Sequence, residues 1–212
     1  MREWLGLDCS RGRLPALNIL TLISMEFPMS RIAVPTRENA PAASQPLLDA
    51  VEKSLGAVPN LFRLLALSPT VLEGYLSQNA ALGKTLDLKT RERIALAVAQ
   101  INGCDYCLSA HTYLGLNLAR IDAYEILAAR KGRSADAKAD LAVSFAAKVA
   151  SERGRVAHAD IEGLRNGGYS DAQIIEIVAL VAENTFTNFV NNVVETEIDF
   201  PVVTTEDLYA AA

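Results

Sequence analysis

Apolar residues recur along most of this 212-residue chain at the three- and four-residue spacing of amphipathic helices. No stretch keeps the strict alternation of apolar and polar positions that a half-buried strand requires. Helices are predicted over residues 46–55, 59–66, 69–83, 88–102, 104–116, 119–130, 135–153, 159–166, 171–184 and 186–195. The pattern therefore predicts an all-α fold arranged as a helical bundle.

Capping residues mark several of the predicted helix ends. Ser134 stands where it can cap the helix over 135–153, and Ser170 with Gln173 has the spacing of a capping box. Two glycines at 167–168 end the predicted helix over 159–166. These signals place most helix boundaries to within a few residues.

Two predicted segments are apolar nearly all round, "IALAVA" at 94–99 and "IVALVA" at 177–182. Helices of this kind lie inside a bundle or at a subunit interface, because no face of them suits water. We therefore expect each segment to be buried in the bundle or against another copy of the chain.

The two apolar segments also resemble each other when Glu92 is aligned with Glu176. The same alignment places Cys104 on Asn188, Cys107 on Asn191 and His111 on Glu195. The chain is therefore interpreted as a duplicated helical unit, whose second copy, over about 159–200, lacks the thiols.

Composition narrows the class of protein. Half of the residues are hydrophobic, so a packed core is expected, and the net charge of -5 without a Lys or Arg cluster argues against nucleic acid and anionic membranes as partners. No segment approaches the roughly 20 apolar residues that span a bilayer. Three cysteines are few and odd in number, which favours a reducing, cytoplasmic location over a secreted disulfide scaffold.

The first 29 residues have a different character from the rest. Their arginines and apolar stretch weakly resemble a signal peptide, but no clear small-residue cleavage site follows. A second start-like stretch begins at Met29, so residues 1–29 are interpreted as an extension outside the fold and 30–212 as the domain. Cys9 lies in the extension and is given no catalytic role.

The chemistry of the chain concentrates in "CDYCLSAH", residues 104–111. If a helix begins there, Cys107 lies in its first turns, where the helix dipole favours a thiolate. His111 follows four residues later on the same face, so the imidazole can take the thiol proton. Cys104, three residues before Cys107, is within reach of a disulfide.

Glu92 is a candidate fourth member of this site. In one continuous helix it would lie about 18 Å from Cys104 by helical rise, too far to contribute. If the chain reverses at Asn102 and Gly103, the two helices run antiparallel and Glu92 comes close enough to orient His111 by a hydrogen bond. That arrangement is a carboxylate–imidazole–thiol relay.

Two other interpretations of these residues stay open. Cysteine is among the most buried residue types, so the pair can be core filler. The two thiols and the imidazole are also good zinc ligands, and Glu92 can supply a fourth ligand, although the chain has no second cysteine pair for a closed site.

The stretch "ERIALAVAQINGCDYCLSAH" contains Glu-x11-Cys-x2-Cys-x3-His and resembles the carboxymuconolactone decarboxylase-like superfamily, on its alkyl hydroperoxidase D branch. The stretches "VPNLFRLLALSPTVLEGYL" (58–76) and "NTFTNFVNNVVETEIDFP" (184–201) are similar to peroxidase-related members of that group. The resemblance covers roughly residues 30 to 201. It implies duplicated helical units that assemble into homo-oligomers.

The resemblance also implies thiol-dependent reduction of hydroperoxides, with a dithiol or protein reductant and no cofactor or metal. Carried over by residue, Cys107 attacks, Cys104 resolves, and His111 with Glu92 forms the proton relay. Alkyl hydroperoxidase D proper has a second histidine between the cysteines, where this chain has Tyr106. Tyr106 therefore either replaces that histidine as a proton donor or only packs as an aromatic.

The resulting hypothesis is a peroxidase-like oxidoreductase that cycles between a dithiol and a disulfide. One alternative is a redox sensor or partner-binding helical protein that uses the same cysteine pair. A second is a carboxymuconolactone decarboxylase-like lyase, which is less favoured because the lactone decarboxylases of the superfamily lack the pair.

Overall fold

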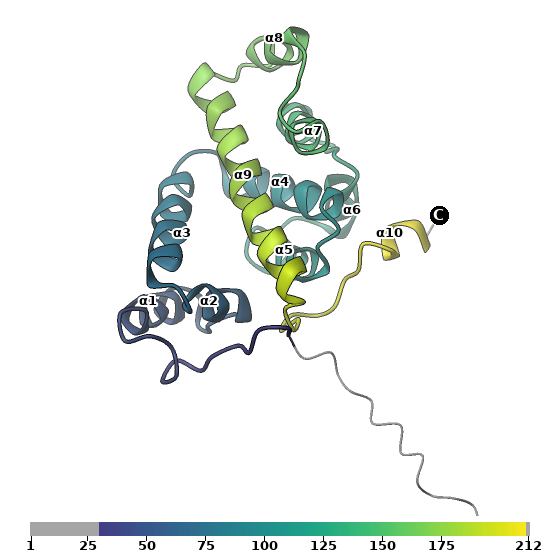
Figure 1. Ribbon diagram of the computed structural model, residues 1–212. Coiled ribbons are helices and arrows are strands. Elements are labelled where there is room, and N and C mark those ends of the chain that lie inside the picture. Colours follow the sequence, from purple (N-terminus) through teal and green to yellow (C-terminus); the bar gives the residue numbers. More distant parts are fainter. Residues whose placement is uncertain (1–29, 211–212) are drawn as a thin grey trace, which may run out of the picture.

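The computed structural model describes residues 30–210, and that part of the chain consists of helices and connecting turns without a strand (Figure 1). The helices are α1 (Gln45–Leu55), α2 (Asn60–Leu65), α3 (Pro69–Leu82), α4 (Leu88–Ile101), α5 (Asp105–Asn117), α6 (Ala123–Arg130), α7 (Ala137–Ser151), α8 (His158–Asn166), α9 (Asp171–Val194) and α10 (Asp207–Ala210). The predicted all-α fold is confirmed. The extension over residues 1–29, with Cys9, lies outside the described residues.

Helix α4 is the centre of the structure and packs against α5, α6, α7 and α9. Every residue of its segment 94–99 is buried. Leu96 and Ala99 belong to a core cluster shared with α5 and α6, whereas Ile94 and Val98 belong to a second cluster shared with α7 and α9. The apolar run of α4 is therefore explained by burial within one chain, and the alternative of a subunit interface at 94–99 is wrong.

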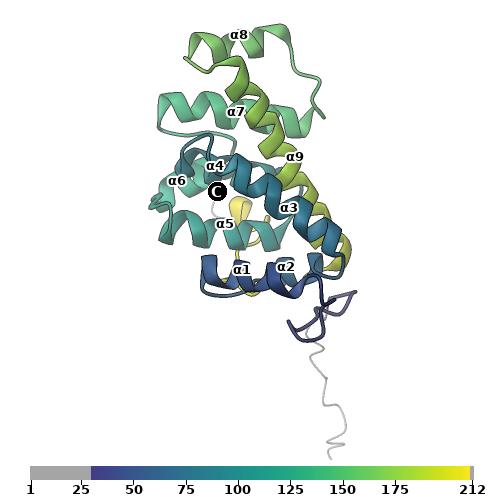
Figure 2. The same ribbon diagram turned by 90° about the vertical axis from the view of Figure 1, so that its left-hand side faces the viewer.

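Helix α9 is one continuous helix, whereas the sequence predicted two, over 171–184 and 186–195. It crosses α4 and α5 over its length and lies beside α3 (Figures 1 and 2). The polar residues at the predicted break stay helical because their side chains bond to the same helix. Asn184 donates to the Leu180 carbonyl at 2.8 Å, and Thr187 donates to the Asn184 carbonyl at 2.9 Å. The internal duplication over about 159–200 stays a prediction.

The capping predictions have a mixed outcome. Ser170 and Gln173 form the predicted capping box at the start of α9. Ser134, however, does not cap α7. Asp136 takes that position, and its carboxylate accepts hydrogen bonds from the backbone N–H groups of Lys138 and Ala139.

The chain after α9 returns along α5, and the sequence did not predict the short helix α10 at its end. The backbone N–H of Thr205 donates to Asp105 at 2.7 Å, and that of Val203 donates to the Ser109 hydroxyl at 2.9 Å. Asp105 and Ser109 both flank Cys107 in α5. This C-terminal segment, residues 196–208, therefore holds the helix that carries the thiols.

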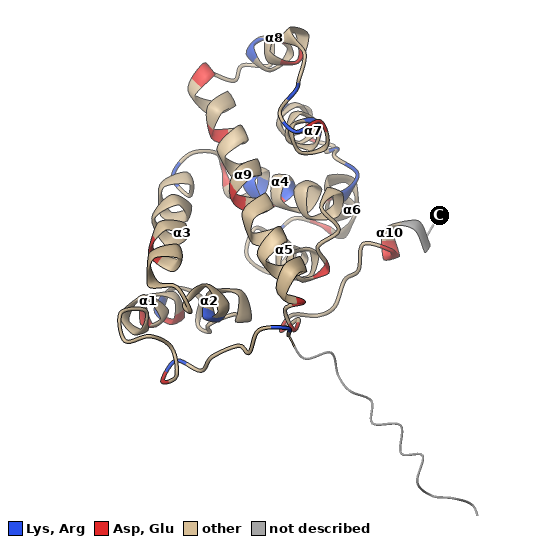
Figure 3. Cartoon of the chain, in the orientation of Figure 1, with Lys and Arg blue, Asp and Glu red and all other residues tan. Residues whose placement is uncertain are grey.

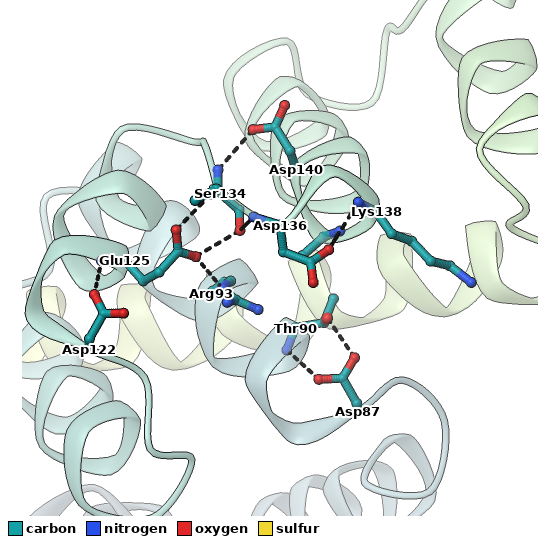
Figure 4. Close-up of polar contacts among 11 residues, drawn as sticks. Asp87, Thr90, Arg93, Asp122, Glu125, Ser134, Asp136, Lys138 and Asp140 are labelled. Atoms are coloured by element: carbon teal, nitrogen blue, oxygen red, sulfur yellow. Dashed lines mark hydrogen bonds and ion pairs between the residues drawn. The ribbon is translucent and has the colours of Figure 1, made fainter.

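A buried carboxylate fixes α6 to the central helix (Figure 4). Glu125 accepts hydrogen bonds from Arg93 of α4 at 2.9 Å and from the Ser134 hydroxyl at 2.8 Å. Its other oxygen accepts from the backbone N–H of Ala135 at 2.6 Å. The Arg93 and Glu125 side chains are 10% and 9% exposed, so removing one partner leaves the other charge buried and unpaired.

We expect Glu125→Ala to lower the free energy of unfolding by about 3–5 kcal/mol, because the Arg93 guanidinium loses its buried partner. Urea denaturation followed by circular dichroism measures the change. Asp171→Ala removes an ion pair with Arg165 that lies at the surface and serves as the control. Equal effects of the two substitutions would contradict a central role for Glu125.

Candidate active site

The turn between α4 and α5 brings the candidate residues together. Asn102 ends α4, and Gly103 follows with φ +65°, a left-handed conformation that glycine adopts without a Cβ clash. The backbone N–H of Cys104 then donates to the Ala99 carbonyl at 3.0 Å. The chain reversal predicted at Asn102 and Gly103 is confirmed, and α5 packs against α4.

The two thiols lie at the start of α5. Cys104 is the N-cap residue, and its sulfur accepts a hydrogen bond from the backbone N–H of Cys107 at 3.4 Å. Both residues are reduced and buried, at 0% and 2% exposure. Cys107 is therefore in the first turn of the helix, as predicted, where backbone N–H groups and the helix dipole favour negative charge.

His111 and Glu92 form the predicted contact between the two helices. His111 Nδ1 lies 2.9 Å from Glu92 Oε2. The two side chains are 22% and 11% exposed, so the imidazole is the part of this pair that reaches furthest toward the surface. With Nδ1 held by the carboxylate, Nε2 is left to exchange a proton with another group.

Two asparagines of α9 complete the surroundings of Cys107, and the sequence argument missed both. Asn191 Nδ2 donates a hydrogen bond to Cys107 Sγ at 3.3 Å. Asn188, one turn earlier, is fully buried and accepts a hydrogen bond from Asn102 Nδ2 at 2.9 Å. The signal was present in the sequence, because polar amides inside an apolar helix need partners when they are buried.

A second buried carboxyl group, Glu183 of α9, also faces the site and was not predicted. Burial raises its pKa, while hydrogen bonding from Asn79 and the charge of His111 partly oppose that shift. Tyr75 of α3 lies nearby; burial, and then the charges of Glu183 and Cys107, raise the pKa of its hydroxyl. The imidazole is therefore flanked by carboxyl groups from two helices.

The environment separates the two thiols chemically. The largest influence on the pKa of Cys107 is a hydrogen bond from the Cys104 thiol, which lowers it, whereas burial raises it. The charge of His111 and the side-chain amides of Asn191 and Asn188 also lower this pKa, and the result is about 6. The same hydrogen bond, together with burial, raises the pKa of Cys104. Cys107 is thus the thiolate of the pair, even though Cys104 lies closer to the helix terminus.

Opposing effects set the protonation of His111. Burial lowers its pKa, but the charge and hydrogen bond of Glu92, followed by the charges of Cys107 and Glu183, outweigh burial and leave the pKa raised. A raised imidazole pKa beside a lowered thiol pKa is the pattern of a thiolate–imidazolium pair.

Tyr106 occupies the position between the cysteines. Its hydroxyl accepts a hydrogen bond from the backbone N–H of Leu61 at 3.1 Å, and its ring packs edge-on against Phe200 with centroids 5.9 Å apart. Burial and the nearby Asp199 charge raise its pKa. These contacts favour the packing role over proton donation.

The described residues contain no cluster of three or more His, Cys, Asp or Glu arranged to hold a metal ion. Within the same residues, no helix has the length and apolar character needed to cross a bilayer. Lys and Arg are scattered over the helices in Figure 3 and do not gather on one element.

Residues 69–152, which include α4 and α5, match the carboxymuconolactone decarboxylase family. A peroxidase-related protein from Ralstonia eutropha with an alkylhydroperoxidase core is 25% identical, with a TM-score of 0.72 over 81% of this chain and 93% of that one. A peroxidase-related protein from a Silicibacter species is 26% identical, with a TM-score of 0.70 over 79% and 91%.

The chain is thus similar to the carboxymuconolactone decarboxylase family over residues 69–152, and it has the fold of peroxidase-related proteins that include an alkylhydroperoxidase core. The debrominase Bmp8 has the same fold, with a TM-score of 0.66 over 83% of this chain and 94% of that one, but at 22% identity this likeness concerns the fold alone. A Haemophilus influenzae protein of unassigned function is 44% identical over 63 residues. That match spans 29% of this chain and half the length of the relative.

The lowered pKa of Cys107 gives a direct prediction for thiol reactivity. Alkylation of Cys107 by iodoacetamide should rise with pH around a midpoint near 6, because only the thiolate reacts. Cys104 should stay unreactive until much higher pH. His111→Ala removes the imidazolium, so the Cys107 midpoint should move to higher pH and alkylation at pH 7 should slow several-fold. Peptide mass spectrometry resolves the two cysteines.

His158, whose side chain is 85% exposed, supplies the control. His158→Ala should leave both midpoints unchanged. If Cys104 alkylates first, or if His111→Ala leaves Cys107 unchanged, the assignment of the thiolate is wrong.

Proposed function

We propose that the protein is a thiol-dependent, peroxidase-like oxidoreductase that reduces hydroperoxides through a Cys104/Cys107 dithiol–disulfide cycle. The observation that carries this proposal is the geometry of Cys107, which lies in the first turn of α5, three residues after Cys104, and whose sulfur accepts a hydrogen bond from Asn191. These contacts lower the pKa of the Cys107 thiol. The similarity to two peroxidase-related structures, at 25% and 26% identity, supports the proposal. His111, which Glu92 orients, lies near enough for its charge to lower the pKa of Cys107, and it can supply the proton that the reaction needs.

In the first step the Cys107 thiolate attacks the terminal oxygen of the hydroperoxide. A sulfur–oxygen bond forms and the oxygen–oxygen bond breaks, giving a sulfenic acid and an alkoxide. The His111 imidazolium donates its proton to the alkoxide, which leaves as an alcohol. Glu92 acts through His111, because its hydrogen bond to Nδ1 orients the ring and stabilises the imidazolium.

In the second step the sulfur of Cys104 attacks the sulfenic acid of Cys107. The disulfide forms, and the released hydroxyl group leaves as water with the proton of the Cys104 thiol. A dithiol or a protein thiol pair then reduces the disulfide by exchange, and Cys107 returns its proton to His111. This cycle needs a reducing compartment, which is consistent with a cytoplasmic location.

Three alternatives make different predictions for these residues. A redox sensor would form the disulfide without sustained turnover, so a continuous supply of dithiol and peroxide separates it from an enzyme. A carboxymuconolactone decarboxylase-like lyase would not need the thiols at all. A zinc site would show as bound metal in the purified protein.

Substitutions of the two cysteines should separate attack from resolution. With a hydroperoxide and a dithiol donor, Cys107→Ser should abolish turnover, because the attacking thiolate is gone. Cys104→Ser should allow a single attack and leave a sulfenic acid at Cys107, which dimedone traps for mass spectrometry. Glu92→Gln should slow turnover less than His111→Ala, because Glu92 only orients the ring.

Cys9→Ser is the matched control and should turn over like the unaltered protein. Sustained turnover by Cys107→Ser would contradict the proposed cycle.

We also propose that α9 forms a contact between copies of the chain. Its outer face carries exposed apolar side chains at the three- and four-residue spacing of a helix-packing seam. They are Ile175, Val178, Phe186, Phe189 and Val193, from 39% to 69% exposed. Of the two segments that were expected to lie in the bundle or against another copy, 94–99 and 177–182, only the second has an exposed large apolar side chain, Val178.

Phe189→Lys should weaken self-association, because it places a charge in the middle of this apolar face. Sedimentation at micromolar concentration measures the shift toward monomer. Tyr124→Lys changes an aromatic that is 75% exposed on α6 and should not alter the oligomeric state. An unaltered protein that is already monomeric would contradict the proposed contact.

A further inference from the structure

The amides of Asn188 and Asn191 surround the reactive sulfur with more hydrogen-bonding groups than the sulfur uses. Both residues lie on one face of α9, three positions apart, at 0% and 2% exposure. Asn191 Nδ2 donates to Cys107 Sγ, and Asn188 also lies close enough to help lower the pKa of Cys107. Two buried amides from one helix face therefore lie against the buried sulfur of Cys107.

Each of these amides keeps one buried polar atom without a well-formed hydrogen bond among the described residues, Asn188 Nδ2 and Asn191 Oδ1. Glu183 Oε1 and Thr112 Oγ1 are also buried without a hydrogen-bond partner, and Thr112 directly follows His111. Buried polar groups without partners are rare in folded proteins, and a catalytic role or a bound small polar molecule is among the explanations for them. These four atoms lie on α5, which carries Cys107 and His111, and on α9, which packs against α5; a fifth such atom, Thr196 Oγ1, lies just beyond the end of α9.

The amides are also held in place, as a binding site requires. Asn102 Nδ2 donates to Asn188 Oδ1 at 2.9 Å, which leaves Nδ2 as the free end of that amide. Asn192 Nδ2 donates to the Asn102 carbonyl at 2.9 Å, a second bond from α9 to the same turn. These two hydrogen bonds with the turn at Asn102 therefore hold this part of α9, and with it the amide of Asn188, in a fixed position relative to Cys104.

We propose that Asn188 and Asn191 form the hydroperoxide-binding site: Asn191 Oδ1 accepts the O–H of the terminal oxygen, and Asn188 Nδ2 donates to the oxygen that leaves as alkoxide. This inference rests on the proposed peroxidase function. Because Asn191 Nδ2 holds the sulfur while its Oδ1 holds the terminal oxygen, one amide aligns the two atoms that form the new bond. Asn188 stabilises negative charge as the oxygen–oxygen bond breaks, before His111 delivers the proton.

The same arrangement defines the class of substrate. A hydroperoxide has one O–H donor for Asn191 Oδ1 and an acceptor oxygen for Asn188 Nδ2. A simple alkylating agent such as iodoacetamide reacts at the same sulfur but has no leaving oxygen to receive the Asn188 donor. The ratio of the hydroperoxide rate to the iodoacetamide rate therefore measures the contribution of the two amides to the peroxide reaction, separately from the general reactivity of the thiolate.

The test compares those two rates in full-length Cys9→Ser/Cys104→Ser protein, in which the reaction stops at the Cys107 sulfenic acid. Rate constants for tert-butyl hydroperoxide and for iodoacetamide are each divided by the thiolate fraction from the alkylation pH profile. Asn188→Leu and Asn191→Leu should lower the corrected peroxide rate about 10- to 100-fold. The corrected alkylation rate should stay within about 2- to 3-fold, since a thiolate already formed does not need the amides to react.

Asn184→Leu is the matched control, because Asn184 is a buried amide on the same helix whose Nδ2 bonds the Leu180 carbonyl. It should change neither rate. If a leucine variant does not fold, Asn188→Ala and Asn191→Ala carry the same expected ratios.

The possible outcomes separate this inference from the proposed function. If the peroxide and alkylation rates fall in parallel, or if neither falls, the amides do not bind the peroxide, although a fast unaltered thiolate would still support a peroxidase. If the unaltered Cys107 thiolate reacts with peroxide no faster than the thiolate of free cysteine, the proposed function and the inference are both wrong.

Discussion

The reversal of the chain at Gly103 is the constraint on which the rest of the site depends. It turns α5 back along α4, so that Glu92 near the start of one helix meets His111 in the middle of the next. It also makes Cys104 the N-cap of α5 and places Cys107 in the first turn, where the helix dipole and the Cys104 hydrogen bond favour a thiolate. A non-glycine residue at φ +65° would strain the turn that creates all three relations.

The second constraint is the cost of placing an ionised thiol inside an apolar core. Cys107 lies in the same cluster as Leu96, Ala99 and Leu108, so its negative charge needs polar partners to compensate for lost water. Helix α9 supplies them as Asn188 and Asn191, which its continuous course carries to the α4–α5 turn. The same course leaves the opposite face of α9 exposed and apolar, which links the chemistry of the site to the proposed contact between copies.

The sequence predicted the all-α fold, the reversal, and the contact between Glu92 and His111, because glycine signals and helical spacing are local properties. The sequence did not predict that α9 is one continuous helix, because a segment rich in Asn and Thr is typical of a helix end. The side-chain hydrogen bonds of Asn184 and Thr187 to carbonyls of the same helix, which keep this segment helical, are not visible in the sequence. In the alignment of the two apolar segments, Thr187 stands where Gly103 stands, so the second segment has no residue suited to the turn.

The amides around Cys107 could not be assigned from sequence for a different reason. Asn191 lies 84 positions beyond Cys107, and only the packing of α9 on α5 brings the two into contact. The same holds for Glu183, which is polar at a position that the apolar pattern assigns to the core. Ser134 was misjudged as a cap because its hydroxyl is used by Glu125, a contact between helices that spacing does not reveal. Polar contacts between residues far apart in the sequence therefore could not be predicted from hydrophobic periodicity.

The most direct test of the account is a single-turnover reaction of the reduced protein with one equivalent of an organic hydroperoxide. Peptide mapping and product analysis measure what forms on the protein and in solution. The proposed cycle predicts one equivalent of alcohol and one Cys104–Cys107 disulfide in the same chain. Disulfides that run mainly through Cys9, or peroxide that is left unconsumed by the reduced protein, would contradict it.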